Sequence, residues 1–298
     1  MRNVLLALAL VVLVTALGGA RPAGAAFPGV NGKIAFVSDR TGNDDIYTFT
    51  PGRSGLTRVT KSAAPDEDPA WSADGTRLAF WSERRGNADI YVANADGSGL
   101  VRVTGHSAPD MRPAWSPDGT QIAFESIRGG NRDVYVKRLG GATTRLTFRA
   151  AADGEPAWSP DGTRIAFASA RSGRWQIYSI VVATGAVTRL TGSGGENHSP
   201  NWSPTGNRIA FWSTRTGNPE IYVMGPNGGN ETRLTSTRGA EYDPAWSPDG
   251  TRIAFYSDRG HFGNFDIYTM AAAGGGLVRY TKVANLDIAP DWAPATTP

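Results

Sequence analysis

A sixfold internal repeat of about 44 residues limits the possible fold of this chain more than any other feature of its sequence. Each copy contains an apolar residue followed by alanine and phenylalanine. The phenylalanines are Phe36, Phe80, Phe124, Phe167, Phe211 and Phe255, spaced 44, 44, 43, 44 and 44 residues apart. A tryptophan stands nine residues before five of them, at Trp71, Trp115, Trp158, Trp202 and Trp246, and Phe27 takes that place in the first copy. Such regularity predicts one structural unit repeated six times.

Each copy is predicted to form four short β-strands. In the second copy the strands span residues 68–72, 77–82, 89–93 and 100–104. Glycine-containing turns separate them, because Gly75 and its equivalents follow the tryptophan–serine pair and Asp96-Gly97 lies between the third and fourth strands. No part of the repeat has helical periodicity.

The predicted fold is therefore all-β, a six-bladed β-propeller of four-stranded antiparallel blades. Repetition around an axis buries both faces of every sheet and leaves only short edges, which explains why the strands are almost continuously apolar. The small alanine between the apolar residue and the phenylalanine allows neighbouring blades to pack closely.

The two ends of the repeat are expected to close the ring together. The first copy lacks a full first strand, whereas Asp287 to Trp292 provides an additional one after the sixth copy. Pairing of this strand beside Lys33 to Ser38 completes the first blade. We assign residues 27–298 to one propeller, with copies near 27–68, 69–112, 113–155, 156–199, 200–243 and 244–285 and a closing strand at 286–293.

Residues 1–26 are predicted to be a signal peptide. A positive start at Arg2 is followed by an apolar stretch from Val4 to Leu17 and by the cleavage pattern Ala23-Gly24-Ala25. We expect cleavage just before Ala26 or Phe27, and an uncleaved leader that acts as an anchor is the alternative. The apolar stretch is shorter than the ~20 residues that a membrane-spanning helix needs. The protein is therefore expected outside the cytoplasm, periplasmic or secreted, with no membrane span after cleavage.

Composition argues against several classes of function. Without the two arginines of the leader, 28 basic side chains stand against 27 acidic ones and no basic run remains, which argues against nucleic-acid binding. The chain has no cysteine, so disulfides, thiolate metal sites and cysteine catalysis are excluded. No nucleophile elbow, zinc-protease motif or phosphate loop occurs, and no catalytic residue is assigned.

The repeat resembles that of the TolB-type propeller family, also called WD40-like. The shared string is P-x-W-S-P-D-G-T-x-I-A-F-x-S-x-R-x-G-N-x-[DE]-I-Y, and Pro244 to Tyr268 carries nearly all of it with two extra residues. The resemblance covers the propeller part only, without the N-terminal domain of TolB. It implies a protein-interaction platform outside the cytoplasm. Similar six-bladed folds include calcium-dependent lactonases and sugar dehydrogenases, which supply an enzymatic alternative.

Positions where a copy departs from the repeat are the best candidates for a binding site, because contacts that maintain the ring recur in every copy. The second-to-third-strand loop of the sixth copy is two residues longer than its equivalents and contains two phenylalanines and one of only three histidines. Exposed aromatic and arginine side chains are typical anchors of protein interfaces. The predicted partner contacts are Arg259, His261, Phe262, Phe265, Trp175 and Tyr242. For Trp175, packing against the neighbouring blade is the alternative.

Two recurrent sets of polar residues are predicted on one face of the ring. The arginines are Arg40, Arg84, Arg128, Arg171, Arg215 and Arg259, and the residues five positions before each tryptophan site are Asp66, Asp110, Asp153, Asn197, Glu241 and Asp287. Because both sets recur, we expect structural arginine–acid pairs. The alternative is an axial cation site, with calcium as the cofactor, held by Asp66, Asp110, Asp153, Glu241 and Asp287.

The sequence therefore predicts an exported, monomeric, non-catalytic module without a cofactor. Its partner is expected to be a protein or peptide in the cell envelope or outside the cell. The alternative is a cation-dependent enzyme or small-ligand binder of the lactonase or sugar dehydrogenase type, with its site on the axis.

Overall fold

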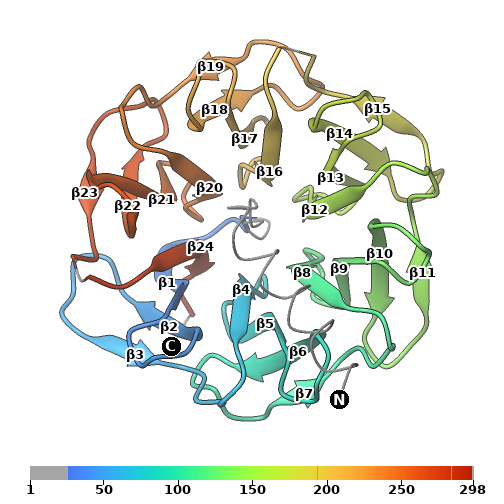
Figure 1. The fold of residues 1–298 in the computed structure, drawn as a ribbon, viewed down its shortest axis with the longest axis horizontal. Coiled ribbons are helices and arrows are strands. Elements are labelled where there is room, and N and C mark those ends of the chain that lie inside the picture. The colour runs from blue at the N-terminus through green and yellow to red at the C-terminus, as the bar shows by residue number, and fades with distance from the viewer. Residues whose placement is uncertain (1–25, 193, 283, 297–298) are drawn as a thin grey trace, which may run out of the picture.

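The fold is a closed ring of six β-sheets. A computed structural model of the chain describes residues 26–192, 194–282 and 284–296. Each sheet has four antiparallel strands, and the sheets are arranged radially around a central axis (Figure 1). The described residues contain no helix, and hence none that could cross a membrane. The predicted six-bladed propeller is confirmed, whereas residues 1–25 of the predicted signal peptide lie outside the described residues.

Five blades are built from strands that are consecutive in the chain. Blade 2 contains β4 (Asp66–Trp71), β5 (Arg77–Ser82), β6 (Asp89–Asn94) and β7 (Val101–Arg102). Blade 3 contains β8 (Asp110–Trp115), β9 (Gln121–Ser126), β10 (Asp133–Arg138) and β11 (Thr143–Arg145). Blade 4 contains β12 (Asp153–Trp158), β13 (Arg164–Ser169), β14 (Gln176–Val181) and β15 (Val187–Arg189).

The remaining two of these five blades follow the same order. Blade 5 contains β16 (Asn197–Trp202), β17 (Ile209–Ser213), β18 (Glu220–Met224) and β19 (Thr232–Arg233). Blade 6 contains β20 (Glu241–Trp246), β21 (Arg252–His261), β22 (Asn264–Ala271) and β23 (Val278–Arg279). In each of these five blades the first strand lies nearest the axis and the fourth lies at the outer edge (Figure 1).

Blade 1 joins the two ends of the described chain. It contains β1 (Asn31–Ser38), β2 (Asp45–Phe49) and β3 (Leu56–Arg58), and its innermost strand is β24 (Asp287–Pro294). Strand β24 pairs with β1 in an antiparallel register that sets Trp292 opposite Ile34 and Asp287 opposite Ser38. The predicted closure of the ring by the C-terminal strand is confirmed.

The tryptophan position of blade 1 is filled by the closing strand, as predicted, and not by Phe27, which precedes the first strand of that blade. Trp292 of β24 occupies that place, since it pairs with Ile34 as Trp71 pairs with Leu78 in blade 2. Phe27 is buried instead in an apolar cluster that also contains Ala70, Trp115 and Trp158. The start of the described chain accordingly lies near the centre of the ring (Figure 1).

Apolar side chains between the sheets form the core. The six apolar–alanine–phenylalanine tripeptides, on the second strands from the axis, are completely buried. The inner-strand tryptophans Trp71, Trp115, Trp158, Trp202, Trp246 and Trp292 are also buried. Close packing of these repeated residues explains why the same tripeptide recurs in each copy.

Each inner strand contains a β-bulge at its third residue. In blade 2, Glu67 pairs with Trp81 and Ala70 with Ala79, so that two inner residues stand opposite Phe80 alone. The third residue has a positive φ, between 47° and 58°, in all six blades. These residues are Asp68, Arg112, Glu155, Ser199, Asp243 and Ala289. A positive φ is costly for residues other than glycine and often marks a functional position.

Candidate functional site

The recurrent arginines and acids form one ion pair within each of five blades. The nitrogen–oxygen distances are 2.8 Å for Arg40–Asp287, 2.6 Å for Arg84–Asp66, 2.5 Å for Arg128–Asp110, 2.8 Å for Arg171–Asp153 and 3.0 Å for Arg259–Glu241. In blade 5, Arg215 donates to the side-chain oxygen of Asn197 at 2.7 Å. The five acids are fully buried. Each arginine therefore compensates the buried charge of an acid in its own blade.

These acids do not form a common metal site. In the described ranges, no group of three or more histidine or acidic side chains is placed to hold a metal ion. The acid of blade 6 differs from the others electrostatically, because burial and then a hydrogen bond with Glu220 of blade 5 raise the pKa of Glu241 to about 7. The five residues proposed for an axial cation thus lie in separate ion pairs.

The residues that converge near the axis are instead those at the bulges. They lie two residues after the recurrent acids, which themselves stand next to the second-to-third-strand loops. We call the face that carries these loops the loop face. Arg112 lies 3.1 Å from a carboxylate oxygen of Glu155 and 3.3 Å from one of Glu125. Glu155 also accepts the backbone N–H of Ser199 at 2.7 Å. The hydroxyl of Ser199 donates to Asp243 at 2.7 Å, which extends the network from blade 3 to blade 6.

Arg112 interacts electrostatically with acids from several blades. Burial opposes the charge of Arg112, yet Glu125 and Glu155, with Asp68 and Asp243, hold the pKa of Arg112 above its ordinary value. Those acids belong to blades 2, 3, 4 and 6. Side chains from opposite sides of the ring therefore lie close enough to interact.

The axial carboxyl groups differ in their preferred protonation states. Burial raises the pKa of Asp243 well above its ordinary value, although the hydrogen bond from Ser199 opposes that shift. Burial also acts to raise the pKa of Glu155, but His198 and Arg112 outweigh it and hold that pKa below its ordinary value. Glu155 therefore favours its anionic form beside Arg112 and the imidazole of His198, whereas Asp243 favours its neutral form.

An array of ring side chains lies next to this network on blades 4, 5 and 6. We call it the aromatic belt, and it consists of Trp175, His198, Trp212, Tyr242, Tyr256 and Phe265. Successive ring centroids are 5.1 Å apart for Trp175–His198, 4.5 Å for His198–Trp212, 5.1 Å for Trp212–Tyr242 and 5.9 Å for Tyr242–Phe265. Tyr256 packs against both Tyr242 and Phe265, at 5.3 Å and 5.2 Å. Trp175, His198, Tyr242 and Phe265 remain partly exposed.

The structure divides the six predicted partner contacts into three groups. Trp175, Tyr242 and Phe265 lie together in the aromatic belt. His261 and Phe262 lie at the tip of the β21–β22 hairpin, where Phe262 is 76% exposed. Arg259 is largely buried and engaged, since it pairs with Glu241 and lies over the rings of Phe255 and Tyr268.

Tyr242 keeps its phenolic proton in this environment. Burial, followed by the negative charges of Asp243, Asp258 and Glu241, raises the pKa of Tyr242 to about 12. The belt therefore presents a neutral hydroxyl beside apolar ring surface, a combination common in protein interfaces.

Sequence reasoning missed the axial network and most of the partners of His198. Comparison of the six copies at the bulge position would have revealed the network, because Asp, Arg, Glu, Ser, Asp and Ala occupy one position while the following proline never changes. Trp212 carried a weaker signal. Its position, directly after the recurrent phenylalanine, holds Val37, Trp81, Glu125, Ala168, Trp212 and Tyr256 in the six copies.

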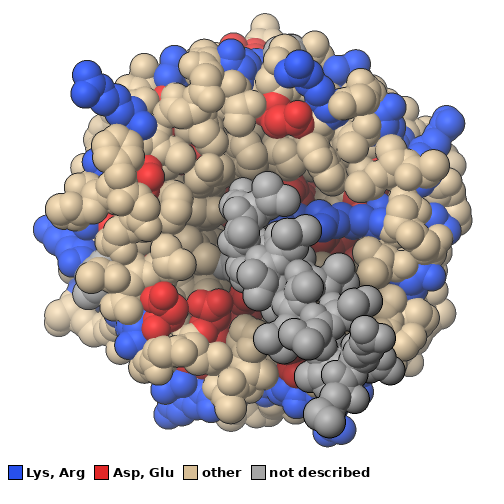
Figure 2. All heavy atoms as spheres, viewed as in Figure 1, with Lys and Arg blue, Asp and Glu red and all other residues tan. Residues whose placement is uncertain are grey.

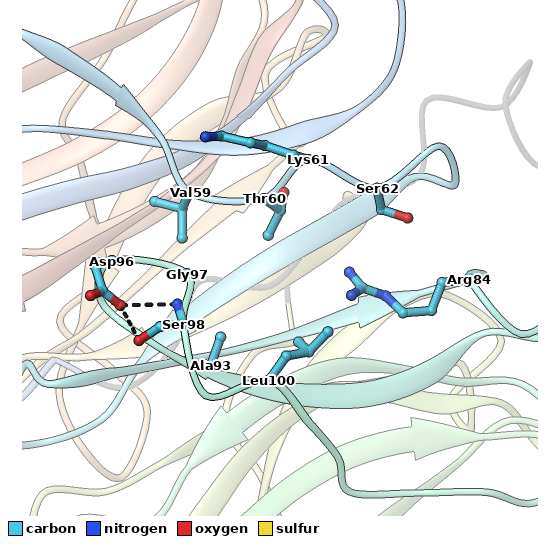
Figure 3. Close-up of a pocket in the computed structure, with 10 residues that line it drawn as sticks. All are labelled: Val59, Thr60, Lys61, Ser62, Arg84, Ala93, Asp96, Gly97, Ser98 and Leu100. Carbon is cyan, nitrogen blue, oxygen red and sulfur yellow. Dashed lines mark hydrogen bonds between the residues drawn. The ribbon is translucent and has the colours of Figure 1, made fainter.

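Two cavities lie elsewhere, at the boundaries of blade 1. The larger, of about 490 Å³, lies between blades 1 and 2 and is lined by Val59, Thr60, Lys61, Ser62, Arg84, Ala93, Asp96, Gly97, Ser98 and Leu100. Figure 3 shows Arg84 and Asp96 at opposite ends of it. Both are engaged, Arg84 with Asp66 and Asp96 with the backbone and hydroxyl of Ser98. The second, of about 240 Å³, is lined by residues of blades 6 and 1, among them Tyr280 and Arg40.

Charged side chains also gather around the centre of the ring at the surface. On the face seen in Figure 2, acidic atoms lie beside the centre on one side, and basic atoms with acidic atoms beneath them lie on the other. Charge of both signs is therefore concentrated towards the axis as well as at the rim.

Comparison with known proteins identifies the repeat and the fold. The model of the TolB beta propeller domain matches residues 11–112, 106–204 and 192–297. No curated protein matches the chain. The crystal structure of TolB from Acinetobacter baumannii is 26% identical, with a TM-score of 0.81 over 95% of this chain and 70% of that one.

Two enzymes share the fold at lower identity. Hydrazine synthase from Kuenenia stuttgartiensis is 17% identical, with a TM-score of 0.74 over 90% of this chain and 47% of that one. An oligogalacturonate lyase from Vibrio parahaemolyticus is 14% identical, with a TM-score of 0.53 over 82% of this chain and 71% of that one. At these identities the likeness concerns the fold alone, and fold does not determine activity.

Proposed function

Because this chain belongs to the TolB beta propeller domain family, we propose that it is an exported, non-catalytic module that binds a protein or peptide on its loop face. The single observation that supports this function best is the aromatic belt, partly exposed and lying beside a buried charged network. Hot spots of protein interfaces combine such aromatic anchors with polar groups that are already ordered. Membership in this family and the predicted signal peptide support a location outside the cytoplasm.

The axial network supports a role in organising the face rather than in catalysis. Ser199 and His198 are adjacent in sequence, but the serine hydroxyl donates to Asp243 while the imidazole lies 3.1 Å from Glu155. Asp68, Glu155, Ser199 and Asp243 are each at most 3% exposed. A partner would therefore contact the belt and the β21–β22 hairpin, with the network beneath them.

A double substitution on blade 6 tests this function. Phe262→Ala with Phe265→Ala is expected to weaken capture of a partner from an envelope extract by at least about tenfold, since truncating two aromatic anchors costs well over 1 kcal/mol. Phe262→Ala alone should change the melting temperature little, because Phe262 is 76% exposed, whereas Phe265→Ala also removes packing against Tyr242 and Tyr256. Capture is measured with immobilised protein and followed by mass spectrometry.

Phe148→Ala is the matched control for that substitution. Phe148 is also a highly exposed phenylalanine, at 71%, but it lies on the connection from blade 3 to blade 4. Its replacement should leave capture unchanged. If the double variant captures partners as well as the wild type does, the partner surface has been placed on the wrong side of the ring.

Calcium and a chelator test the cation-dependent alternative. We expect the melting temperature to be the same with calcium and with a chelator, because the arginine of each blade already balances the acid that a cation would need. A metal bound only to the folded state would add about 2.7 kcal/mol at a hundredfold excess over its dissociation constant. Stoichiometric metal in the purified protein, together with a chelator-sensitive melt, would instead support the enzyme alternative.

A further inference from the structure

His198 has an environment unlike that of any other described histidine. Its imidazole lies between two indole rings, stacked at 4.5 Å and 14° on Trp212 and tilted at 5.1 Å and 36° against Trp175. His106 is exposed and accepts the backbone N–H of Ala108, and His261 is exposed at a hairpin tip. His198 is the only described histidine that joins the aromatic belt to the axial network, and Trp212 also joins them, because its Nε1–H donates to the hydroxyl of Ser199 at 3.2 Å.

The polar contact of His198 is with a buried acid. Its Nδ1 lies 3.1 Å and 3.3 Å from the two carboxylate oxygens of Glu155. Glu155 is 2% exposed and also contacts Arg112 and the N–H of Ser199. A protonated imidazole would donate to this carboxylate and complete the compensation of its charge.

The charged groups around the imidazole come from four blades. Glu155 approaches from β12, Arg112 from β8 on the far side of Glu155, and Asp243 from β20 through Ser199. Glu196 lies on the connection leading to β16, where its carboxylate accepts the backbone N–H of Trp175 at 2.7 Å. Two indole faces and the nearby acids favour a cation at this position.

We propose that His198 is a pH-sensitive element of the loop face, whose protonated imidazole holds Trp175, Trp212 and Glu155 in the arrangement described. Loss of the proton removes the ion pair with Glu155 and the cation–π contacts with both indoles. Trp175, which is partly exposed, is then free to leave the belt. Protonation of one imidazole thereby sets the shape of the proposed binding surface.

Tryptophan fluorescence tests this inference directly. A protonated imidazole quenches an adjacent indole, so emission from the purified protein should rise with increasing pH. Asp291, which accepts the backbone N–H of Trp71, also titrates, so part of the change is expected to be independent of His198. His198→Gln should reduce the change, whereas His106→Gln and His261→Gln should leave it as in the wild type. A change of wild-type size in a folded His198→Gln protein would overturn the proposal.

Nuclear magnetic resonance of the wild-type protein gives a test that needs no substitution. With histidine labelling, only three imidazole signals are expected, and stacking on two indoles should shift that of His198 upfield. This signal should move with pH together with indole N–H signals. An imidazole signal that moves without any change in the indole signals would contradict the proposed coupling.

Regulation of binding by His198 rests on the proposed function, whereas its protonation does not. Absence of the fluorescence and resonance titrations overturns the His198 inference alone. Absence of partner capture at every pH overturns the proposed function alone. If the function holds, capture by the wild type should weaken from about pH 5.5 to about pH 7.5 and that by His198→Gln should not.

Discussion

Removal of residues 287–298 is expected to abolish the cooperative unfolding transition of this protein. The deletion removes β24, the inner strand of blade 1, and with it the fully buried Trp292. Loss of a buried tryptophan side chain alone costs about 3–5 kcal/mol. A typical domain is stable by only about 5–15 kcal/mol, and β1 would also lose its strand partner. Thermal melts followed by near-ultraviolet circular dichroism should therefore show no sharp transition.

A shorter truncation provides the control for this experiment. Removal of residues 297–298 keeps β24 and the hydrogen bond from Ala295 N–H to the carbonyl of Val30. That protein should melt as the full chain does. An unchanged melting temperature after the longer deletion would show that five complete blades and an open sixth are stable without closure.

Asp291→Asn is expected to stabilise the protein by up to about 4 kcal/mol above pH 7. Burial raises the pKa of Asp291 to about 7, and the backbone N–H groups of Trp71 and Trp292 only partly oppose that shift. Because the folded pKa exceeds the unfolded one, the stabilising contribution is fully present below about pH 4 and is lost as the pH rises through about 7. An asparagine has no proton to lose, so the variant should lack this decline.

Blade 5 shows that asparagine fits this position. Asn201 occupies the equivalent site, and its side-chain oxygen accepts the backbone N–H of Trp246 at 2.9 Å, as Asp291 accepts that of Trp71 at 2.7 Å. The measurement is the free energy of unfolding by urea at pH 5 and pH 8. Equal losses of unfolding free energy in the wild type and the variant between pH 5 and pH 8 would contradict the raised pKa of Asp291.

Asp118→Asn serves as a control that should change the stability in the opposite direction. Hydrogen bonds from Ser116 and Thr120 hold the pKa of Asp118 below its ordinary value. Its contribution is therefore present at neutral pH and is lost only as the pH falls through that lowered pKa. This substitution should weaken the protein at pH 8, where Asp291→Asn strengthens it.

The sequence predicted the ring far better than it predicted the site. Strand number and closure by Asp287 to Trp292 follow from a repeat that is nearly identical in six copies. The inner strands begin earlier than expected, at Asp66 rather than Asp68 in blade 2.

The axial network was not predicted from the regular strand pattern, because backbone geometry creates it. Regular alternation along an inner strand would direct Asp68 and its equivalents to the same side of the sheet as Asp66. The bulge, with its positive φ, turns them to a different direction. Departures from the repeat did identify Trp175, Tyr242 and Phe265, yet they did not identify His198, because its neighbours Trp212 and Glu155 are distant in sequence.

Blade 1 combines strands from both ends of the described chain, and this determines when the ring can be completed. The ion pair between Arg40 and Asp287 joins residues 247 positions apart, so no contact of this kind forms until nearly the whole chain has been synthesised and has emerged. Contacts between such distant residues form slowly, and we expect closure to be the last and slowest step of folding. The ion pairs and hydrogen bonds described for the axial network join blades 3 to 6. The binding surface can therefore be assembled first, while the unpaired inner side of β1 remains open to exchange with another chain.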